Sequence, residues 1–443
     1  MLETKTTLPL SSPKGPKVDY ELLLDCVHCG LCTASCPTYV ETSNEADSPR
    51  GRIYLMRSVI DGDLALDDGV KEHLDLCLNC RACETACPSG VQYGKLIEPF
   101  REYLAEKEPG RAVKSLNAIQ RWMLFSIFPS RTRTRLALAP ARLAQWTGLD
   151  WLVEKIGLTK LLPKKLRTMK QMLPPLARHY GRMPEVLPAE GKRRARVGLF
   201  LGCVADALYP QTNLNTARVL QKNGCEVRIP RSQGCCGALH YHAAETAEAV
   251  NLIGKNCTAF GVDSPEWNQL DAIVTNAAGC GAMMKEYAHI SHGTPHESAA
   301  TKFNAKVKDI SEFLVELGPV QPTHPLNIKA TYHDACHLRH AQQIQSAPRK
   351  LLEMIPGLEL VPLAESELCC GAAGSYNLTQ PEMAGKLGDR KAENIRATGA
   401  KACFIGNVGC TMQIARHLKA AAPDLWLAHP VDALWASYSG EKP

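Results

Sequence analysis

Cys26-Val-His-Cys-Gly-Leu-Cys-Thr-Ala-Ser-Cys-Pro37 is followed by a second stretch with the same spacing, Cys77-Leu-Asn-Cys-Arg-Ala-Cys-Glu-Thr-Ala-Cys-Pro88. A cubane [4Fe–4S] cluster needs four thiolates, and two-residue gaps let one loop supply three of them. In paired motifs of this spacing the fourth cysteine ligates the other cluster. The sequence therefore predicts two [4Fe–4S] clusters, the first held by Cys26, Cys29, Cys32 and Cys87, and the second by Cys77, Cys80, Cys83 and Cys36.

Zinc is the alternative metal, because it also takes four cysteines. Its usual C-x₂-C pairs lack the third close cysteine, and the second copy of the motif favours clusters. The long spacer between the motifs contains a helical pattern at Ile53–Ile60, which favours an α-helical ferredoxin type over a compact β-rich one. Arg50 and Arg52 are either surface charges or positive charges that raise the cluster potential.

The bulk composition agrees with a cluster protein in a reducing compartment. A chain of 443 residues, 45% hydrophobic and 22% charged, is long enough for two or three domains. Its 19 cysteines are odd in number and grouped, which disfavours a secreted disulfide framework. The N-terminus shows no signal peptide, and no stretch approaches the length of a membrane-spanning helix. We expect a cytoplasmic protein, soluble or peripheral to the membrane.

Cysteine content and charge divide the chain into five segments. They are a flexible tail (1–19), a ferredoxin domain (20–105), a basic helical connector without cysteine (106–195), and two repeats (196–320 and 321–443). The stretch 109–196 has 19 Lys and Arg against four acidic residues, so its net charge is +15 in a chain of net charge +6.

The two repeats predict parallel α/β units. In the first, apolar runs at Val197–Leu201, Cys225–Ile229 and Asp271–Thr275 lead to cysteine-bearing loops, and a helical pattern lies at Asn215–Asn223. In the second, the runs are Lys329–Tyr332, Leu358–Val361 and Ala402–Ile405, with a helical pattern at Arg349–Ile355. Chemistry in such units gathers after the carboxyl ends of the strands, which is where the repeat cysteines fall.

The repeat pattern Cys203…Cys235-Cys236-Gly237…Cys280, followed by Cys336…Cys369-Cys370-Gly371…Cys410, resembles the cysteine-rich CCG domain of heterodisulfide reductases. Together with the two cluster motifs, the chain resembles the iron–sulfur subunit of glycolate oxidase (glycolate dehydrogenase) over about residues 20–435. Further stretches that carry the resemblance are Pro49-Arg-Gly-Arg-Ile-Tyr-Leu55, Tyr241-His242, Ala278-Gly-Cys-Gly-Ala282 and Lys285-Glu-Tyr287. It implies a helical ferredoxin domain, a helical connector and two pseudo-repeated α/β lobes facing each other, with their cysteine loops in one cleft.

The resemblance implies an electron-carrying subunit of an oxidoreductase complex. Electrons would come from glycolate, or another 2-hydroxy acid, through FAD on a partner subunit and leave toward a quinone or other membrane acceptor. No catalytic residue is expected on this chain, which has no G-x-G-x-x-G motif. L-lactate and anaerobic glycerol-3-phosphate dehydrogenases have similar subunits, and a catalytic heterodisulfide-reductase-like role is a third alternative. A sensor or scaffold role lacks a DNA-binding element.

The CCG cysteines depart from the full pattern. Full domains end in C-x-x-C, whereas Ala277 and Asn407 stand at the first position here. The third site is therefore predicted with less support: Cys203, Cys235, Cys236, Cys280, Cys336, Cys369, Cys370 and Cys410 could hold a distorted cluster, form redox-active pairs, or be retained structure. Cys225, Cys257 and Cys403 fit no motif, which favours core packing.

Four histidines lie near the repeat cysteines: His240, His242, His333 and His337. Each could be a ligand or a hydrogen-bond donor to a quinone, but a loop or core role is favoured.

The connector combines basic residues with Trp122, Phe125, Phe128, Trp146 and Trp151. Such a segment could lie on an anionic membrane surface, although packing against protein is favoured. Nucleic acid is not expected, because no recognition motif accompanies the charge.

Overall fold

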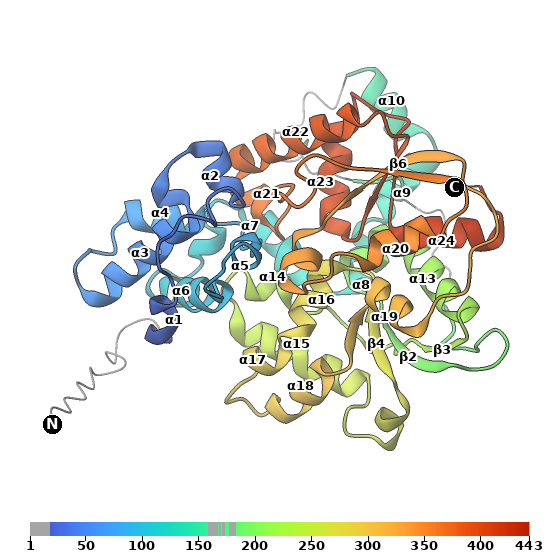
Figure 1. Ribbon diagram of the computed structural model, residues 1–443, viewed down its shortest axis with the longest axis horizontal. Coiled ribbons are helices and arrows are strands. Elements are labelled where there is room, and N and C mark those ends of the chain that lie inside the picture. Colours follow the sequence, from blue (N-terminus) through green and yellow to red (C-terminus); the bar gives the residue numbers. More distant parts are fainter. Residues whose placement is uncertain (1–17, 158–166, 168–169, 171–172, 177–182, 443) are drawn as a thin grey trace.

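The computed structural model describes residues 18–157, 167, 170, 173–176 and 183–442 of the chain. The predicted tail lies almost entirely outside these residues. Figure 1 shows the ferredoxin domain at one end of the molecule, against two α/β lobes. No helix in the described ranges is long and apolar enough to cross a membrane.

Residues 18–107 form helices without a strand. They are α1 (Tyr20–Leu24), α2 (Pro37–Thr42), α3 (Pro49–Asp61), α4 (Asp68–Asp75), α5 (Ala82–Thr85) and α6 (Gly94–Lys107). Cys36 is the N-cap of α2, with Pro37 in its first turn, and Ser48 caps α3 through the backbone N–H of Gly51. A core that includes Leu23, Met56, Leu74 and Phe100 lies between these helices.

The two cluster motifs have the same backbone design. His28 and Gly30 in the first motif have φ angles of 53° and 87°, and Asn79 and Arg81 at the matching positions of the second have φ angles of 51° and 62°. Left-handed residues on both sides of the middle cysteine turn the loop sharply. This curvature lets a short loop present several thiols toward one centre.

Each lobe contains a sheet whose four parallel strands have the same order. The first sheet runs β3-β2-β4-β5 and the second runs β7-β6-β8-β9. The strands are β2 (Ala195–Phe200), β3 (Cys225–Arg228), β4 (Ala272–Thr275) and β5 (Val307–Asp309), then β6 (Ile328–His333), β7 (Leu358–Val361), β8 (Ala402–Ile405) and β9 (Trp426–Ala428). The loops after β2 and β4, and after β6 and β8, lie at the topological switch point, where doubly wound sheets bind ligands.

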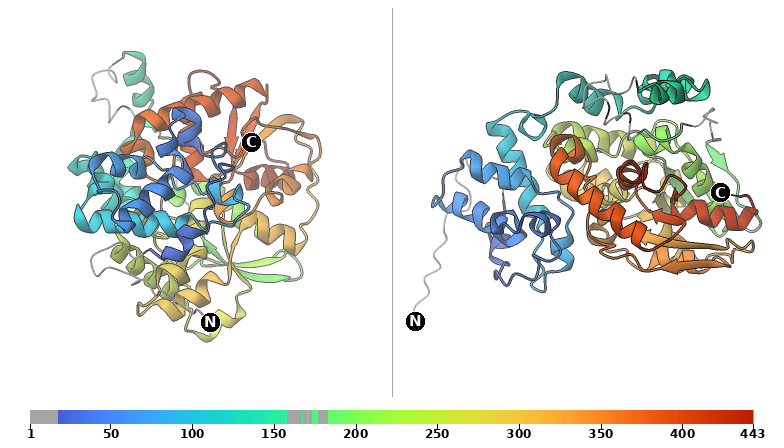
Figure 2. Two further views of the ribbon diagram at one scale, coloured as in Figure 1. Left: turned by 60° about the vertical axis from the view of Figure 1, so that its left-hand side comes forward. Right: turned by 90° about the horizontal axis from the view of Figure 1, so that it is seen from above.

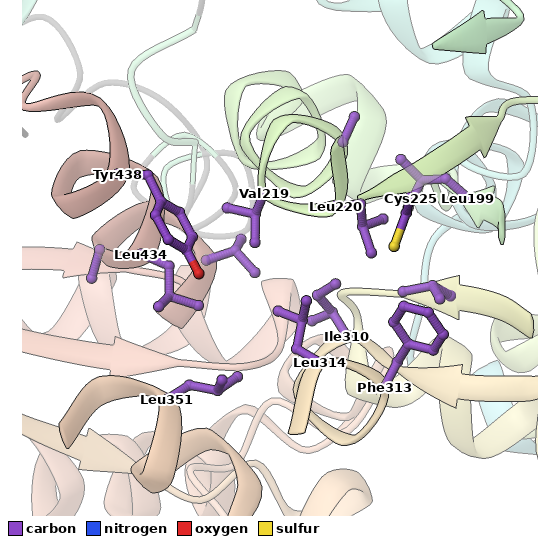
Figure 3. Close-up of a cluster of buried hydrophobic side chains, with 14 of the residues drawn as sticks. Leu199, Val219, Leu220, Cys225, Ile310, Phe313, Leu314, Leu351, Leu434 and Tyr438 are labelled. Atoms are coloured by element: carbon purple, nitrogen blue, oxygen red, sulfur yellow. The ribbon is translucent and has the colours of Figure 1, made fainter. Parts of the chain in front are cut away.

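Helices that cover the two sheets pack against each other across the boundary between the lobes. In the first lobe these are α13 (Pro210–Lys222) and α19 (Ile310–Leu317), and in the second α20 (Ala347–Glu353) and α24 (Pro430–Ser439). Helix α24 packs on α13, and α19 packs on α20. Figure 3 shows Leu220, Ile310, Leu314, Leu351 and Leu434 converging on the common interior. The lobes therefore share one hydrophobic core.

Further helices complete the lobes. They are α12 (Val204–Leu208), α14 (Ala238–Tyr241), α15 (Thr246–Ala259), α16 (Ala278–Lys285), α17 (Tyr287–Ile290), α18 (Glu297–Asn304), α21 (Tyr376–Thr379), α22 (Pro381–Ala397) and α23 (Val408–Leu418). Helices α16 and α23 begin just before Cys280 and Cys410, so both cysteines sit in a first helical turn.

The connector contains α7 (Ala118–Trp122), a π-helical turn (Met123–Ile127), α8 (Arg131–Ala137), α9 (Ala139–Trp146) and α10 (Leu149–Lys155). Figure 2 (right) shows these teal helices along one side of the lobes. Arg131 and Arg135 form ion pairs of 2.9 and 2.7 Å with the buried Asp206 of α12. The connector is not wholly helical, because β1 (Val186–Leu187) adds an antiparallel edge strand to β3.

Candidate functional site

The first cysteine group lines a pocket at the surface of the ferredoxin domain. Cys26, Cys29, Cys32 and Cys87 face this pocket, Cys83 also reaches its wall, and Arg50 closes another part of the wall. Burial raises the pKa of Cys26, and the neighbouring Cys87 raises it further. Cys87, from the second motif, therefore lies beside the three leading cysteines of the first.

The second group is buried more deeply. Cys36, Cys77 and Cys80 are less than 10% exposed. Burial raises the pKa of Cys83 well above its ordinary value, and Cys80, Cys77 and Cys36 contribute to this increase through their negative charge. Cys36, from the first motif, therefore lies among the three leading cysteines of the second.

Hydrogen-bond donors surround the buried thiols. The backbone N–H of Asn79 donates to Cys77 Sγ over 3.4 Å, and the hydroxyl of Tyr93 donates to the same sulfur over 3.7 Å. Donors of this kind stabilise the negative charge of cluster thiolates and tune the reduction potential. The two groups offer only sulfur ligands in confined positions, so their chemistry fits two [4Fe–4S] clusters.

Arg52 is not a surface charge, because its side chain is only 1% exposed. It donates hydrogen bonds to the carbonyl of His73 and to Thr38 Oγ1, and its guanidinium lies 3.8 Å from Asp47 and 3.9 Å from Cys36 Sγ. The structure therefore places a buried positive charge beside the second cysteine group. Arg50 is part-exposed and binds Glu45 and the carbonyl of His28.

The CCG cysteines form two groups of four, one in each lobe, and the convergence of both groups in one cleft stays a prediction. In the first lobe, Cys235 contacts Cys203 and Cys236, and Cys236 contacts Cys280. Their surroundings are one apolar cluster that includes Phe200. The loops of the lobes do touch, since Gly279 N donates to Asn407 Oδ1 over 3.3 Å.

In the second lobe, the Sγ atoms of Cys336 and Cys369 are 3.9 Å apart. Cys370 contacts both Cys369 and Cys410, and these contacts hold its pKa well below the ordinary value. The Nδ2 of Asn407 donates to Cys410 Sγ over 3.4 Å. The four cysteines of this lobe therefore contact one another in succession, and these contacts stabilise the thiolate form of Cys370.

The second lobe touches the ferredoxin domain through its cysteines. Cys80, Cys336 and Cys369 belong to one buried cluster, and Tyr376 of that cluster donates to the carbonyl of Leu76 over 2.8 Å. Burial raises the pKa of Cys80 strongly, and among its neighbours Cys336 raises it most. The second ferredoxin group and the group in the second lobe are therefore immediate neighbours.

A pocket with a cavity volume of about 120 Å³ lies where the ferredoxin domain meets both lobes. It is lined by Cys77, His242, His337 and Tyr376, among other residues. His242 Nδ1 lies 2.9 Å from Glu98 Oε1, and Asn79 also hydrogen-bonds Glu98. His242 lowers the pKa of Glu98 although burial opposes this.

The four histidines have different settings. His242 and His337 line the pocket, His240 is buried against the ring of Phe125, and His333 is buried beside Cys370 and Cys410. Glu98 and Tyr93 carry no signal in the sequence, because nothing in the local pattern marks a residue that acts through a distant contact. The three cysteines without a motif, Cys225, Cys257 and Cys403, are buried in apolar clusters, as expected.

Three protein-family descriptions match the chain. A 4Fe-4S dicluster domain matches residues 22–91, the linker region of the glycolate oxidase iron-sulfur subunit matches 117–173, and a cysteine-rich domain matches twice, at 197–285 and 330–415. The dicluster match includes all eight motif cysteines, and the chain carries iron–sulfur clusters.

Several relatives cover most of the chain. The probable glycolate oxidase iron-sulfur subunit of Bacillus subtilis is 39% identical over 90% of this chain and 89% of the relative. The glycolate oxidase iron-sulfur subunit of Escherichia coli is 33% identical over 89% and 90%. Lactate utilization protein A of Geobacillus kaustophilus is 31% identical, but over only 54% of this chain and 98% of the relative.

Proposed function

Because the chain belongs to the family of glycolate oxidase iron–sulfur subunits, and so is a subunit of an oxidoreductase complex, we propose that it carries electrons from a flavoprotein partner toward a membrane acceptor. The observation that carries this proposal is the contact between successive cysteine groups. Two ferredoxin groups share one small domain, and the second of them touches the second lobe through Cys80 and Cys336.

The proposed cluster ligands are those the motif spacing predicts. Cys26, Cys29, Cys32 and Cys87 would hold the first [4Fe–4S] cluster, because they line one pocket and Cys87 and Cys29 are the cysteine neighbours that act on Cys26. The second cluster would be held by Cys77, Cys80, Cys83 and Cys36. When bound, the clusters supply one-electron transfer. The protein's part is to hold the thiolates, to donate hydrogen bonds from Asn79 and Tyr93, and to exclude water.

The proposed donor is glycolate or a related 2-hydroxy acid, oxidised on an FAD-containing partner. Relatives with glycolate oxidase in their names match about nine-tenths of this chain, whereas the lactate utilization protein matches about half. L-lactate is therefore the second candidate. The proposed division of the chain is a ferredoxin domain at 20–105, a connector at 106–195 and lobes at 196–320 and 321–443.

We place the acceptor in the pocket between the ferredoxin domain and the lobes. His242 and His337 could hydrogen-bond the oxygens of a quinone, and Cys77 of the second proposed cluster lies in the same wall. Glu98 accepts a hydrogen bond from Asn79 and pairs with His242, so the histidine is held in a fixed orientation.

The connector would bring this subunit to the membrane surface. Helices α9 and α10 bury none of their residues. Their exposed apolar side chains include Leu143, Trp146, Leu149, Trp151 and Leu152, and the exposed Ile156 follows α10 directly. The whole stretch 109–196, which contains these helices, has a net charge of +15. Basic surfaces with exposed Trp and Leu bind anionic lipid headgroups.

The first experiment is an anaerobic purification of the native complex through this chain. The isolate is assayed for flavin and for dye reduction with glycolate, D-lactate, L-lactate and glycerol 3-phosphate. Flavin together with glycolate-dependent turnover is expected. Turnover with L-lactate alone would change the donor but keep the electron-carrying role, and intact clusters without flavin or turnover would overturn the proposal.

A further inference from the structure

His333 and Phe200 occupy the same place in the two lobes. Each is the last residue of the central strand of its sheet. In the register of the strands, His333 lies opposite Ile405 and Phe200 lies opposite Thr275, and both partners are the last residues of their strands. Each also stands three residues before the first cysteine of its repeat. The strand registers therefore align His333 with Phe200. The first lobe has an apolar ring where the second has an imidazole.

His333 is fully buried, and neither of its ring nitrogens has a partner at hydrogen-bond geometry, while the imidazole lies close enough to Cys370 to help lower the pKa of that thiol. Buried polar groups are nearly always paired, because an unpaired group loses the free energy of its hydration. A nitrogen of His333 and the sulfur atoms of Cys370 and Cys410 all lie within 4.8 Å of one another. The unpaired imidazole is thus aimed into the cysteine group.

The spacing of these three ligand atoms suits one metal atom. Sulfur and nitrogen ligands at about 2.3 and 2.1 Å from a tetrahedral metal lie roughly 3.5–4 Å from each other. In the described part of the chain, no other set of three or more His, Cys, Asp or Glu ligand atoms is gathered as closely. The lobe with Phe200 therefore has no equivalent.

The number of ligands also fits. The full CCG pattern has five cysteines, and each repeat here has four, with Asn407 in place of the fifth in the second lobe. Asn407 hydrogen-bonds Cys410, so it positions that thiol. His333 restores the count to five, together with Cys336 and Cys369, whose sulfur atoms are 3.9 Å apart.

We propose that His333 is a ligand of an iron–sulfur centre in the second lobe, which is also held by Cys336, Cys369, Cys370 and Cys410, and that the first lobe lacks this centre. Imidazole is a common ligand of iron, and histidine replaces cysteine on iron in some iron–sulfur centres. The inference does not depend on the substrate or the acceptor. The centre would continue the row of cysteine groups beyond Cys80.

The test uses the full chain, expressed with ⁵⁷Fe and purified anaerobically. Mössbauer spectra and iron analysis are compared between wild type and His333→Phe, which copies the first lobe. The matched control is His240→Phe, a buried histidine of the first lobe whose Nδ1 is also unpaired. His333→Cys tests whether a thiolate can replace the imidazole.

A Mössbauer component beyond those of the two [4Fe–4S] clusters is expected. It should be lost in His333→Phe, persist in His240→Phe and return in His333→Cys. In wild type, nitrogen hyperfine coupling to the reduced or oxidised centre should be present, and it should be absent in His333→Cys. An additional iron component that survives in His333→Phe, zinc in place of the iron, or no metal beyond the two clusters would each overturn the proposal.

Discussion

Cys80 of the ferredoxin domain and Cys336 of the second lobe lie in one buried cluster, although they come from different domains. Burial raises the pKa of Cys80, and the negative charge of Cys336 raises it further, as expected for two thiols in one buried cluster. The contact fixes the position of the second lobe relative to the second ferredoxin group. It also makes the second lobe the immediate neighbour of the second proposed cluster, while the first lobe contacts the ferredoxin domain through Glu286 and His242.

Arg52→Met should destabilise the protein by roughly 3–5 kcal/mol, because it leaves the buried Asp47 without its guanidinium partner. It should also lower the reduction potential of the proposed cluster beside Cys36, since a nearby positive charge is lost. Denaturant unfolding and a redox titration measure the two effects. Arg50→Met is the control, and its cost should stay below about 1 kcal/mol because the Arg50–Glu45 pair is exposed. Equal losses of stability and equal shifts of the reduction potential in the two variants would contradict the assignment of Arg52 as the buried charge beside the second cysteine group.

The ion pair between Arg81 and Glu286 joins the ferredoxin domain to the first lobe. Both side chains are largely shielded from water, so the coupling should exceed that of a surface pair. A double-mutant cycle with Arg81→Met and Glu286→Gln should give a coupling of about 1–2 kcal/mol in unfolding experiments. The same cycle on Lys302 and Asp263, an exposed pair of 3.2 Å, should give less than about 1 kcal/mol. A coupling of zero between Arg81 and Glu286 would mean that this contact does not hold the domains together.

Asp309 should make the protein less stable as the pH rises. Burial raises its pKa from 3.8 to about 6, and Oδ2 has no hydrogen-bond partner, whereas Oδ1 caps α19. Since the folded state holds the proton more tightly, this contribution is full below about pH 4 and is lost as the pH rises through about 6. Asp309→Asn keeps the cap without the charge.

Thermal or denaturant unfolding from pH 4 to 8 should therefore show wild type losing roughly 3 kcal/mol relative to Asp309→Asn over that range. The difference in unfolding free energy between wild type and Asp309→Asn reports on Asp309 alone, because all other titrating groups are the same in both proteins. A difference that does not change with pH would show that the carboxylate is charged throughout.

The double variant Trp146→Ser, Trp151→Ser should lower binding to vesicles of anionic lipid at least tenfold. Each large apolar side chain that enters the interface contributes about 1.5–3 kcal/mol, and about 1.4 kcal/mol corresponds to a factor of ten. Co-sedimentation measures the partition coefficient. Tyr54→Ser removes an aromatic ring that is 61% exposed on the ferredoxin domain, and it should leave binding unchanged. Equal binding to neutral vesicles would contradict the role of charge.

Periodicity and spacing predicted the parts of the fold that local pattern determines. The run Val197–Leu201 corresponds to β2 at Ala195–Phe200, and the pattern Arg349–Ile355 to α20 at Ala347–Glu353. The strands β5 and β9 have three residues each, and β1 has two. Such short runs carry no recognisable alternation, so only pairing with a neighbouring strand identifies them.

The site shows the same division. Cysteine spacing indicates which thiols can share a loop, but the environment of Arg52 depends on His73 and Asp47, which approach it only in the folded domain. Likewise, His333 differs from the other histidines through its missing hydrogen bonds and its distance to Cys370. Both are properties of three-dimensional contacts and leave no mark in the local sequence.

The packing of α24 on α13 has a consequence for biosynthesis. The core that the lobes share includes Val431 and Leu434 of α24, which belongs to the second lobe. The first lobe therefore cannot complete its core until the second lobe has been synthesised as far as Ser439. The ferredoxin domain has a core of its own from residues made early. Insertion of iron and sulfur is thus expected in two stages, first in the ferredoxin domain and then, once α24 has been synthesised, in the second lobe.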